Sequence, residues 1–75
     1  MGSLPVVKQT DVRRALEKAG FRAVHQTGSH VKLVRGDRAV TVQQHKARDM
    51  PIGTLRAILD QAGMSVDEFK HWLKE

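Results

Sequence analysis

The sequence predicts a single α+β domain in which one helix is followed by three strands and then by two more helices. A segment with helical spacing precedes three short alternating stretches, and two further helical segments come after them. Grouped strands with segregated helices are typical of α+β folds, in which helices cover one face of an antiparallel sheet. A chain of 75 residues is too short for two cores, so we expect residues 1–75 to form one domain. Residues 1–3 are either native or a remnant of cloning.

The first element is a short amphipathic helix over residues 11–19. Its apolar side chains recur at the spacing of one helical face: Val12, Ala15, Leu16 and Ala19. Thr10 is the expected N-cap, and Gly20 is expected to end the helix because glycine adopts the left-handed conformation without steric cost. Phe21 is then placed to fold back over the last turn.

The middle of the chain alternates between apolar and polar residues, which is the pattern of half-buried strands. We predict a three-stranded antiparallel meander over Phe21–Gln26, His30–Arg35 and Ala39–Gln43. A two-residue turn at 36–37 pairs Leu33 with Val40 and Val31 with Val42, all on one face. The opposite face then carries His30, Lys32 and Thr41.

The first hairpin has two possible registers. A two-residue turn at 27–28 pairs His25 with His30 on one face of the sheet. A three-residue turn instead pairs Gln26 with His30 and directs His25 inward beside Val31. The sequence does not choose between them.

Two helices are predicted after a polar, basic loop at residues 44–50. Pro51 opens the first of them, which ends at Gly63. Its apolar face is formed by Leu55, Ile58, Leu59 and Ala62. Residues 65–68 have the pattern of a capping box, in which a serine hydroxyl and a glutamate carboxylate each accept from the other residue's backbone amide. A short last helix is therefore expected to extend through Leu73.

The charge is unevenly distributed along the chain. The formal net charge is +5, with +7 over residues 1–48 and −2 over residues 49–75. A basic half of this kind favours a polyanionic partner, of which nucleic acid is the commonest, although an acidic protein would bind the same surface.

Several classes of protein are excluded by composition. The absence of cysteine excludes disulfides, thiolate metal sites and cysteine nucleophiles, and it suits a reducing cytoplasm. No apolar run is long enough to cross a bilayer, and the first ten residues lack a secretory signal. We therefore expect a soluble cytoplasmic protein that binds no membrane.

Metal and cofactor chemistry are not expected. The four histidines are scattered without the spacing of a zinc site, and neither GxGxxG nor GxxxxGK occurs.

The remaining candidate for catalytic chemistry is the tripeptide Gly28-Ser29-His30. An imidazole exchanges protons near neutral pH and is suited to removing the 2′-hydroxyl proton of RNA, so that the 2′-oxygen attacks the adjacent phosphorus. Lys32, on the same strand face, is placed to stabilise the charge that develops on that phosphate.

The tripeptide alone is a weak signal, because a histidine at a strand end is more often an ordinary hairpin residue than a catalyst. Ser29 and the Gly28 turn are assigned to orienting the phosphate or the imidazole. His25 is favoured as a sheet residue, with a second acid–base role as the alternative. His45 is either solvated or a phosphate contact. The supporting RNA-binding residues are predicted to be Lys32, Arg13, Arg14, Arg22, His45, Lys46 and Arg48.

Taken together, these pieces resemble the HicA toxin family, the small YcfA-like mRNA interferases of bacterial and archaeal type II toxin–antitoxin modules. The resemblance covers nearly the whole chain, and its specificity comes from the order and spacing of the pieces. In order they are Leu16-Glu17-Lys18-Ala19-Gly20-Phe21, Gln26 with Gly28-Ser29-His30, Val40-Thr41-Val42 with His45, Gly53-Thr54-Leu55-Arg56-Ala57-Ile58-Leu59, and Gln61-Ala62-Gly63-Met64-Ser65 with Glu68-Phe69.

The resemblance implies a fold like that of a double-stranded-RNA-binding domain. It further implies a translation-independent endoribonuclease activity, a catalytic histidine at His30, and inhibition by a HicB-type antitoxin that covers the active-site face. Two positions depart from the family pattern. Gln43 replaces the proline that commonly follows the Val-Thr-Val strand, and Val31 stands where a second histidine or polar residue often follows the motif.

Two alternatives belong to other functional classes. A non-catalytic RNA-binding module would use the same fold and the same basic residues. A pure interaction domain would use its basic face only to dock an acidic protein.

Overall fold

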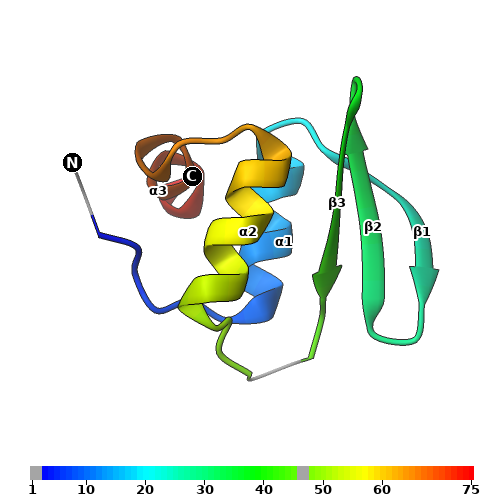
Figure 1. Ribbon diagram of the computed structural model, residues 1–75, viewed down its shortest axis with the longest axis horizontal. Coiled ribbons are helices and arrows are strands. Elements are labelled where there is room, and N and C mark those ends of the chain that lie inside the picture. The colour runs from blue at the N-terminus through cyan, green and yellow to red at the C-terminus, as the bar shows by residue number, and fades with distance from the viewer. Residues whose placement is uncertain (1–2, 46–47) are drawn as a thin grey trace.

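The predicted order of elements is confirmed by the computed structural model, which describes residues 3–45 and 48–75. Three strands lie side by side and the helices pack on one face of them (Figure 1). The elements are α1 (Gln9–Lys18), β1 (Arg22–Thr27), β2 (His30–Arg35), β3 (Arg38–Gln43), α2 (Ile52–Ala62) and α3 (Val66–Lys74).

The core lies between the helices and one face of the sheet. Strand β2 pairs with both neighbours in an antiparallel sheet of order β1-β2-β3. The core-facing strand residues are Val31, Leu33, Val40 and Val42, each at most 2% exposed. No residue of β1 is buried, and Figure 1 shows this strand as the one farthest from the helices. The helices therefore cover β2 and β3 and leave both faces of β1 accessible.

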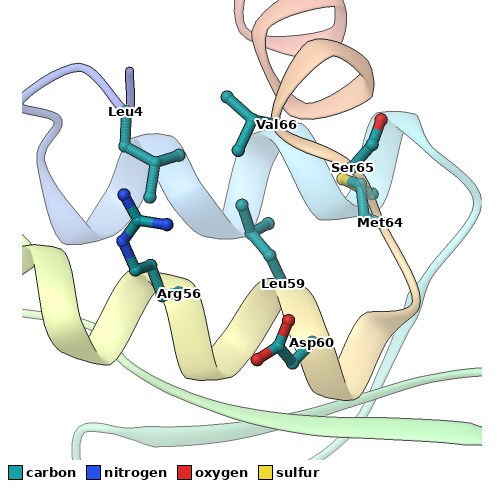
Figure 2. A pocket seen from close by; sticks show the side chains of 7 residues that line it. All are labelled: Leu4, Arg56, Leu59, Asp60, Met64, Ser65 and Val66. Carbon is teal, nitrogen blue, oxygen red and sulfur yellow. The ribbon is translucent and has the colours of Figure 1, made fainter. Parts of the chain in front are cut away.

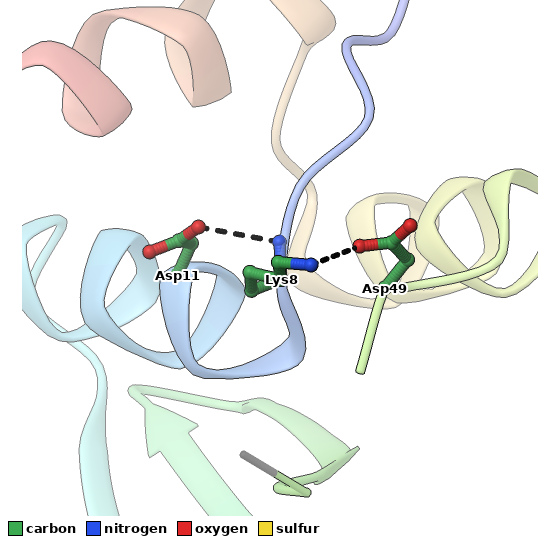
Figure 3. A network of polar contacts seen from close by, with 3 residues as sticks. All are labelled: Lys8, Asp11 and Asp49. Atoms are coloured by element: carbon green, nitrogen blue, oxygen red, sulfur yellow. Dashed lines mark hydrogen bonds and ion pairs between the residues drawn. The ribbon is translucent and has the colours of Figure 1, made fainter. Parts of the chain in front are cut away.

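Helix α1 begins earlier than the sequence predicts. Thr10 lies inside the helix rather than at its N-cap, which is Lys8. The backbone amide of Lys8 donates to the Asp11 carboxylate at 3.2 Å, and its ammonium pairs with Asp49 at 2.8 Å (Figure 3). The amide of Gln9 donates to the carbonyl of Arg48 at 2.9 Å. The loop before α2 thus fixes the start of α1, and no local sequence signal reports such a contact.

The end of α1 is as predicted. The amide of Phe21 donates to the carbonyl of Leu16 at 3.0 Å, and the Phe21 ring is 2% exposed. Arg35 crosses this helix end, donating to the carbonyl of Ala19 at 2.7 Å with its guanidinium 4.7 Å from the centre of the Phe21 ring. A cation is favourable there because it faces the negative end of the helix dipole.

The register of the second hairpin is confirmed, whereas neither proposed register of the first is correct. Leu33 pairs with Val40, as the turn at 36–37 predicts. In the first hairpin the turn is formed by residues 28–29, so that His30 pairs with Thr27. These pairs are one residue away from the register of the three-residue turn, and a bulge between Ala23 and His25 takes up the difference, so that Ala23 pairs with Leu33.

The helical pair at the C-terminus follows the sequence closely. Pro51 is the N-cap of α2, and Gly63 ends that helix with a left-handed φ of 70°. The hydroxyl of Ser65 accepts from the amide of Glu68 at 3.1 Å, which is the serine half of the predicted capping box. Phe69 in α3 is fully buried, so this last helix completes the core.

Replacing Gly63 by alanine is expected to destabilise the fold by about 1–2 kcal/mol, because an L-residue is strained at this φ. An added Cβ would also lie 2.9 Å from Cζ of Arg38, so that side chain would have to move. Urea unfolding monitored by circular dichroism measures the effect. Gly53→Ala is the matched control, since Gly53 is inside α2 and a Cβ there meets nothing within 4 Å. A Gly63→Ala protein as stable as the parent would contradict the prediction.

Candidate functional site

Six polar residues form two rows across the outer face of the sheet, and we call them the open-face site. One row runs from β1 to β3 as His25, Lys32 and Thr41, and the adjacent row as Thr27, His30 and Gln43. All six side chains are exposed. They face outward because strand residues alternate between the two faces, and the intervening residues of β2 and β3 are buried under the helices.

His30 stands at the end of β2, immediately after the 28–29 turn. Gln43 lies directly opposite, and its Nε2 donates to Nε2 of His30 at 3.3 Å. Gln43 has no role in the sequence analysis beyond replacing a proline. The signal that places it was present, because extending the predicted β2–β3 pairing by one step sets Gln43 against His30.

The turn before His30 is tied to helix α1 through Gln44. The amide of Gln44 donates to the carbonyl of Ser29 at 2.6 Å, which extends the β2–β3 ladder beyond Gln43. Its side-chain oxygen accepts a hydrogen bond from Nη1 of Arg13, which also pairs with Glu17 at 3.5 Å. The helix layer therefore holds the backbone next to His30 in place. Sequence reasoning missed Gln44, although extending the predicted β2–β3 pairing one step beyond Gln43 sets it against Ser29. Its contact with Arg13 has no such local signal.

His25 shares the face of His30, although not by either predicted register. It pairs with Lys32 across the strands, and its Nε2 lies 2.9 Å from the hydroxyl oxygen of Thr27. The corrected turn thus brings His25, Lys32 and His30 into one cluster. Arg22 lies further along β1, opposite Val34, on the same face.

The other predicted supporting residues lie apart from this cluster. Helix α1 is on the opposite side of the sheet, where Arg14 is exposed and pairs with Asp11 at 2.9 Å. His45 follows β3, and its amide donates to the side-chain oxygen of Gln9 at 2.9 Å. Arg48 is exposed in the loop before α2. Lys46 lies outside the described residues.

The positive charge of residues 1–48 is less concentrated around His30 than the linear sequence indicates. Arg35 and Arg38 pair at the far end of the β2–β3 hairpin, where they pack near the ends of α1 and α2. The open-face site itself contains one lysine, two histidines and no carboxylate. Across residues 3–45 and 48–75, no group of three metal-ligating side chains is found. The arrangement is suited to contacting an anion and exchanging protons with it.

A pocket of about 240 Å³ lies elsewhere, on the helical side of the molecule (Figure 2). Arg56 and Asp60 place one charge of each sign at its wall. Its lining comes from the N-terminal segment, α2 and the start of α3: Leu4, Arg56, Leu59, Asp60, Met64, Ser65 and Val66. No strand residue contributes, so this pocket is separate from the open-face site.

Comparison with known proteins gives one family. No curated protein sequence matches the chain. Within the described residues, no helix has the length and apolarity that crossing a bilayer requires. The model of the family described as the HicA toxin of bacterial toxin–antitoxin systems matches residues 10–64, which include all three strands and α2. The chain therefore belongs to the HicA toxin family.

Proposed function

We propose that the protein is a metal-independent endoribonuclease that acts as the toxin of a type II toxin–antitoxin module. The observation that carries this proposal is the outward-facing His30, set beside Lys32 on a sheet face that bears no carboxylate. A polyanion can approach such a face without repulsion, and the imidazole is free of any acidic partner among the described residues.

The chemistry uses the nucleophile that RNA itself carries. His30 removes the proton of a 2′-hydroxyl, and the 2′-oxygen attacks the adjacent phosphorus. The bond from phosphorus to the 5′-oxygen breaks, a proton is delivered to that oxygen, and the products end in a 2′,3′-cyclic phosphate and a 5′-hydroxyl. Lys32 stabilises the negative charge that develops on the phosphate during the displacement. The sequence of steps requires no metal and no cofactor.

Binding of the RNA backbone is assigned to the basic residues around the site. Lys32 and Arg22 share the outer face with His30. The backbone of Gly28 and Ser29 borders that face at the turn, where it orients the imidazole or a phosphate oxygen. Arg13 and Arg14 are on α1, behind the sheet, so we assign them to flanking nucleotides. His45, Lys46 and Arg48 complete the proposed supporting set.

Electrophoresis of a labelled mRNA incubated with the protein in EDTA tests the proposal. We expect the RNA to be shortened into fragments. A band that is shifted but intact on a native gel and full-length on a denaturing gel would establish the non-catalytic RNA-binding alternative instead. An RNA that is neither cut nor shifted at low salt would leave only the protein-docking alternative.

The partner implied by the family is an antitoxin, which we propose to be of the HicB type and to cover the open-face site. Co-expression with the neighbouring reading frame, followed by affinity purification of the tagged toxin, tests this assignment. We expect a small protein to co-purify and RNA cleavage to be suppressed in the complex. A co-purified protein that leaves cleavage unchanged would contradict the placement of the antitoxin on this face.

A further inference from the structure

We propose that His25 is a second catalytic residue, the general acid that gives a proton to the leaving 5′-oxygen. This inference rests on the proposed ribonuclease function and deepens it. His30 accounts for one proton transfer, but the displacement needs a second at the opposite end of the broken bond. A departing alkoxide is a poor leaving group unless it is protonated as the bond breaks.

The position of His25 meets the geometric requirement for that role. In an in-line displacement the attacking 2′-oxygen and the leaving 5′-oxygen lie on opposite sides of phosphorus, so the base and the acid must flank one phosphate. His25 pairs with Lys32, two positions along β2 from His30. Such diagonal neighbours on one face of a sheet are about 7 Å apart. Side chains that start from positions at that spacing can each reach one of the two oxygens, and Lys32 lies on the same face, directly opposite His25.

The hydrogen-bond partners are compatible with both roles. The amide nitrogen of Gln43 lies 3.3 Å from Nε2 of His30 and can donate to a lone pair there, as a base requires. The hydroxyl of Thr27 lies 2.9 Å from Nε2 of His25 and can accept from the protonated ring that an acid requires. We therefore assign His30 as the base and His25 as the acid.

No other imidazole in the described residues is placed as well. His45 lies beyond the end of β3, where its backbone is held by Gln9. His71 is in α3 and packs against Trp72, with the ring centres 4.7 Å apart. Neither residue belongs to the two rows of the open-face site.

A substrate with an altered leaving group tests the assignment. The two substrates are an RNA oligonucleotide and the same oligonucleotide with a bridging 5′-sulfur at the cleaved bond, whose thiolate leaves without a proton. We expect His25→Ala to lower the cleavage rate of the ordinary linkage by about 10²–10⁴-fold and to cleave the sulfur linkage nearly as fast as the parent. His30→Ala is expected to be slow on both linkages, because its step precedes the leaving group.

Two controls separate this role from a structural one. His71→Ala should match the parent on both substrates, and circular dichroism should show that every variant is folded, since His25 and His30 are exposed. A purely structural defect in His25→Ala would slow both linkages equally and would overturn the inference. So would a His25→Ala protein with parental activity, or rescue by sulfur in His45→Ala instead. If His30→Ala also cleaves normally, the proposed function itself fails.

Discussion

Replacing His30 by alanine is expected to reduce RNA cleavage in EDTA by about 10²–10⁴-fold, the range that a positioned general base contributes. The variant should still bind RNA, because Lys32 and Arg22 remain on the same face. It should also fold normally, since the His30 side chain is exposed and makes one hydrogen bond, to Gln43. Cleavage of a labelled oligonucleotide under single-turnover conditions measures the change.

The conservative variant His30→Gln is the matched control for this prediction. Glutamine can keep a hydrogen bond to Gln43 but cannot exchange a proton near neutral pH. If positioning alone matters, His30→Gln will retain activity, and the general-base role is wrong. Expression in cells offers a second readout, because both His30 variants should permit growth that the parent arrests.

Replacing Phe69 by alanine is expected to lower the free energy of unfolding by about 3–5 kcal/mol, the usual cost of emptying a buried phenylalanine site. The side chain is fully buried, and α3 packs against α1. A domain of this length has a total stability of about 4–11 kcal/mol, so the loss is a large part of it. Urea denaturation gives the value.

Two control variants show whether the loss of stability comes from the apolar volume of Phe69. Phe69→Leu keeps most of the apolar volume and should lose less, whereas the exposed Lys74→Ala should stay within about 0.5 kcal/mol of the parent. The prediction has a consequence for domain boundaries, because the family match ends at residue 64, before α3. A Phe69→Ala protein as stable as the parent would mean that α3 is dispensable to the core.

Local sequence signals predict most of the fold because each element carries its own pattern. The alternation of β2 and β3 leaves only one register that buries Val31, Leu33, Val40 and Val42 together, and the turn at 36–37 agrees with it. The end of α2 and the start of α3 are likewise set locally, because Gly63 is the C-cap of one helix and Ser65 the N-cap of the other.

The first hairpin could not be predicted because its outer strand lacks such a constraint. Every residue of β1 is exposed, so no burial pattern selects a register. Gly28, at a φ of 58°, suits a turn as either its first or its second residue. At residues 25–27, β1 then pairs one residue away from the register of the three-residue turn, and the bulge near Ala23 takes up the difference. This shift is what brings His25 opposite Lys32.

The candidate site, like the fold, could be predicted from the sequence only in part. His30 and Lys32 follow from the motif and the strand alternation, and the structure places both on the outer face as expected. The Gln44 side chain and the start of α1 depend on contacts between segments distant in sequence, Arg13 with Gln44 and Gln9 with Arg48. Such contacts leave no trace in local spacing.

Analysis of the ends of cleaved RNA by mass spectrometry tests the central claim most directly. The substrate is an oligonucleotide cleaved by the parent protein in EDTA, compared with the same strand carrying a single 2′-deoxy sugar at the cleaved position. We predict a 2′,3′-cyclic phosphate and a 5′-hydroxyl on the ordinary strand, and no cleavage at the deoxy position, because the attacking oxygen is missing there. Cleavage at the deoxy sugar, or products ending in a 3′-hydroxyl and a 5′-phosphate, would contradict a mechanism in which His30 activates the 2′-hydroxyl.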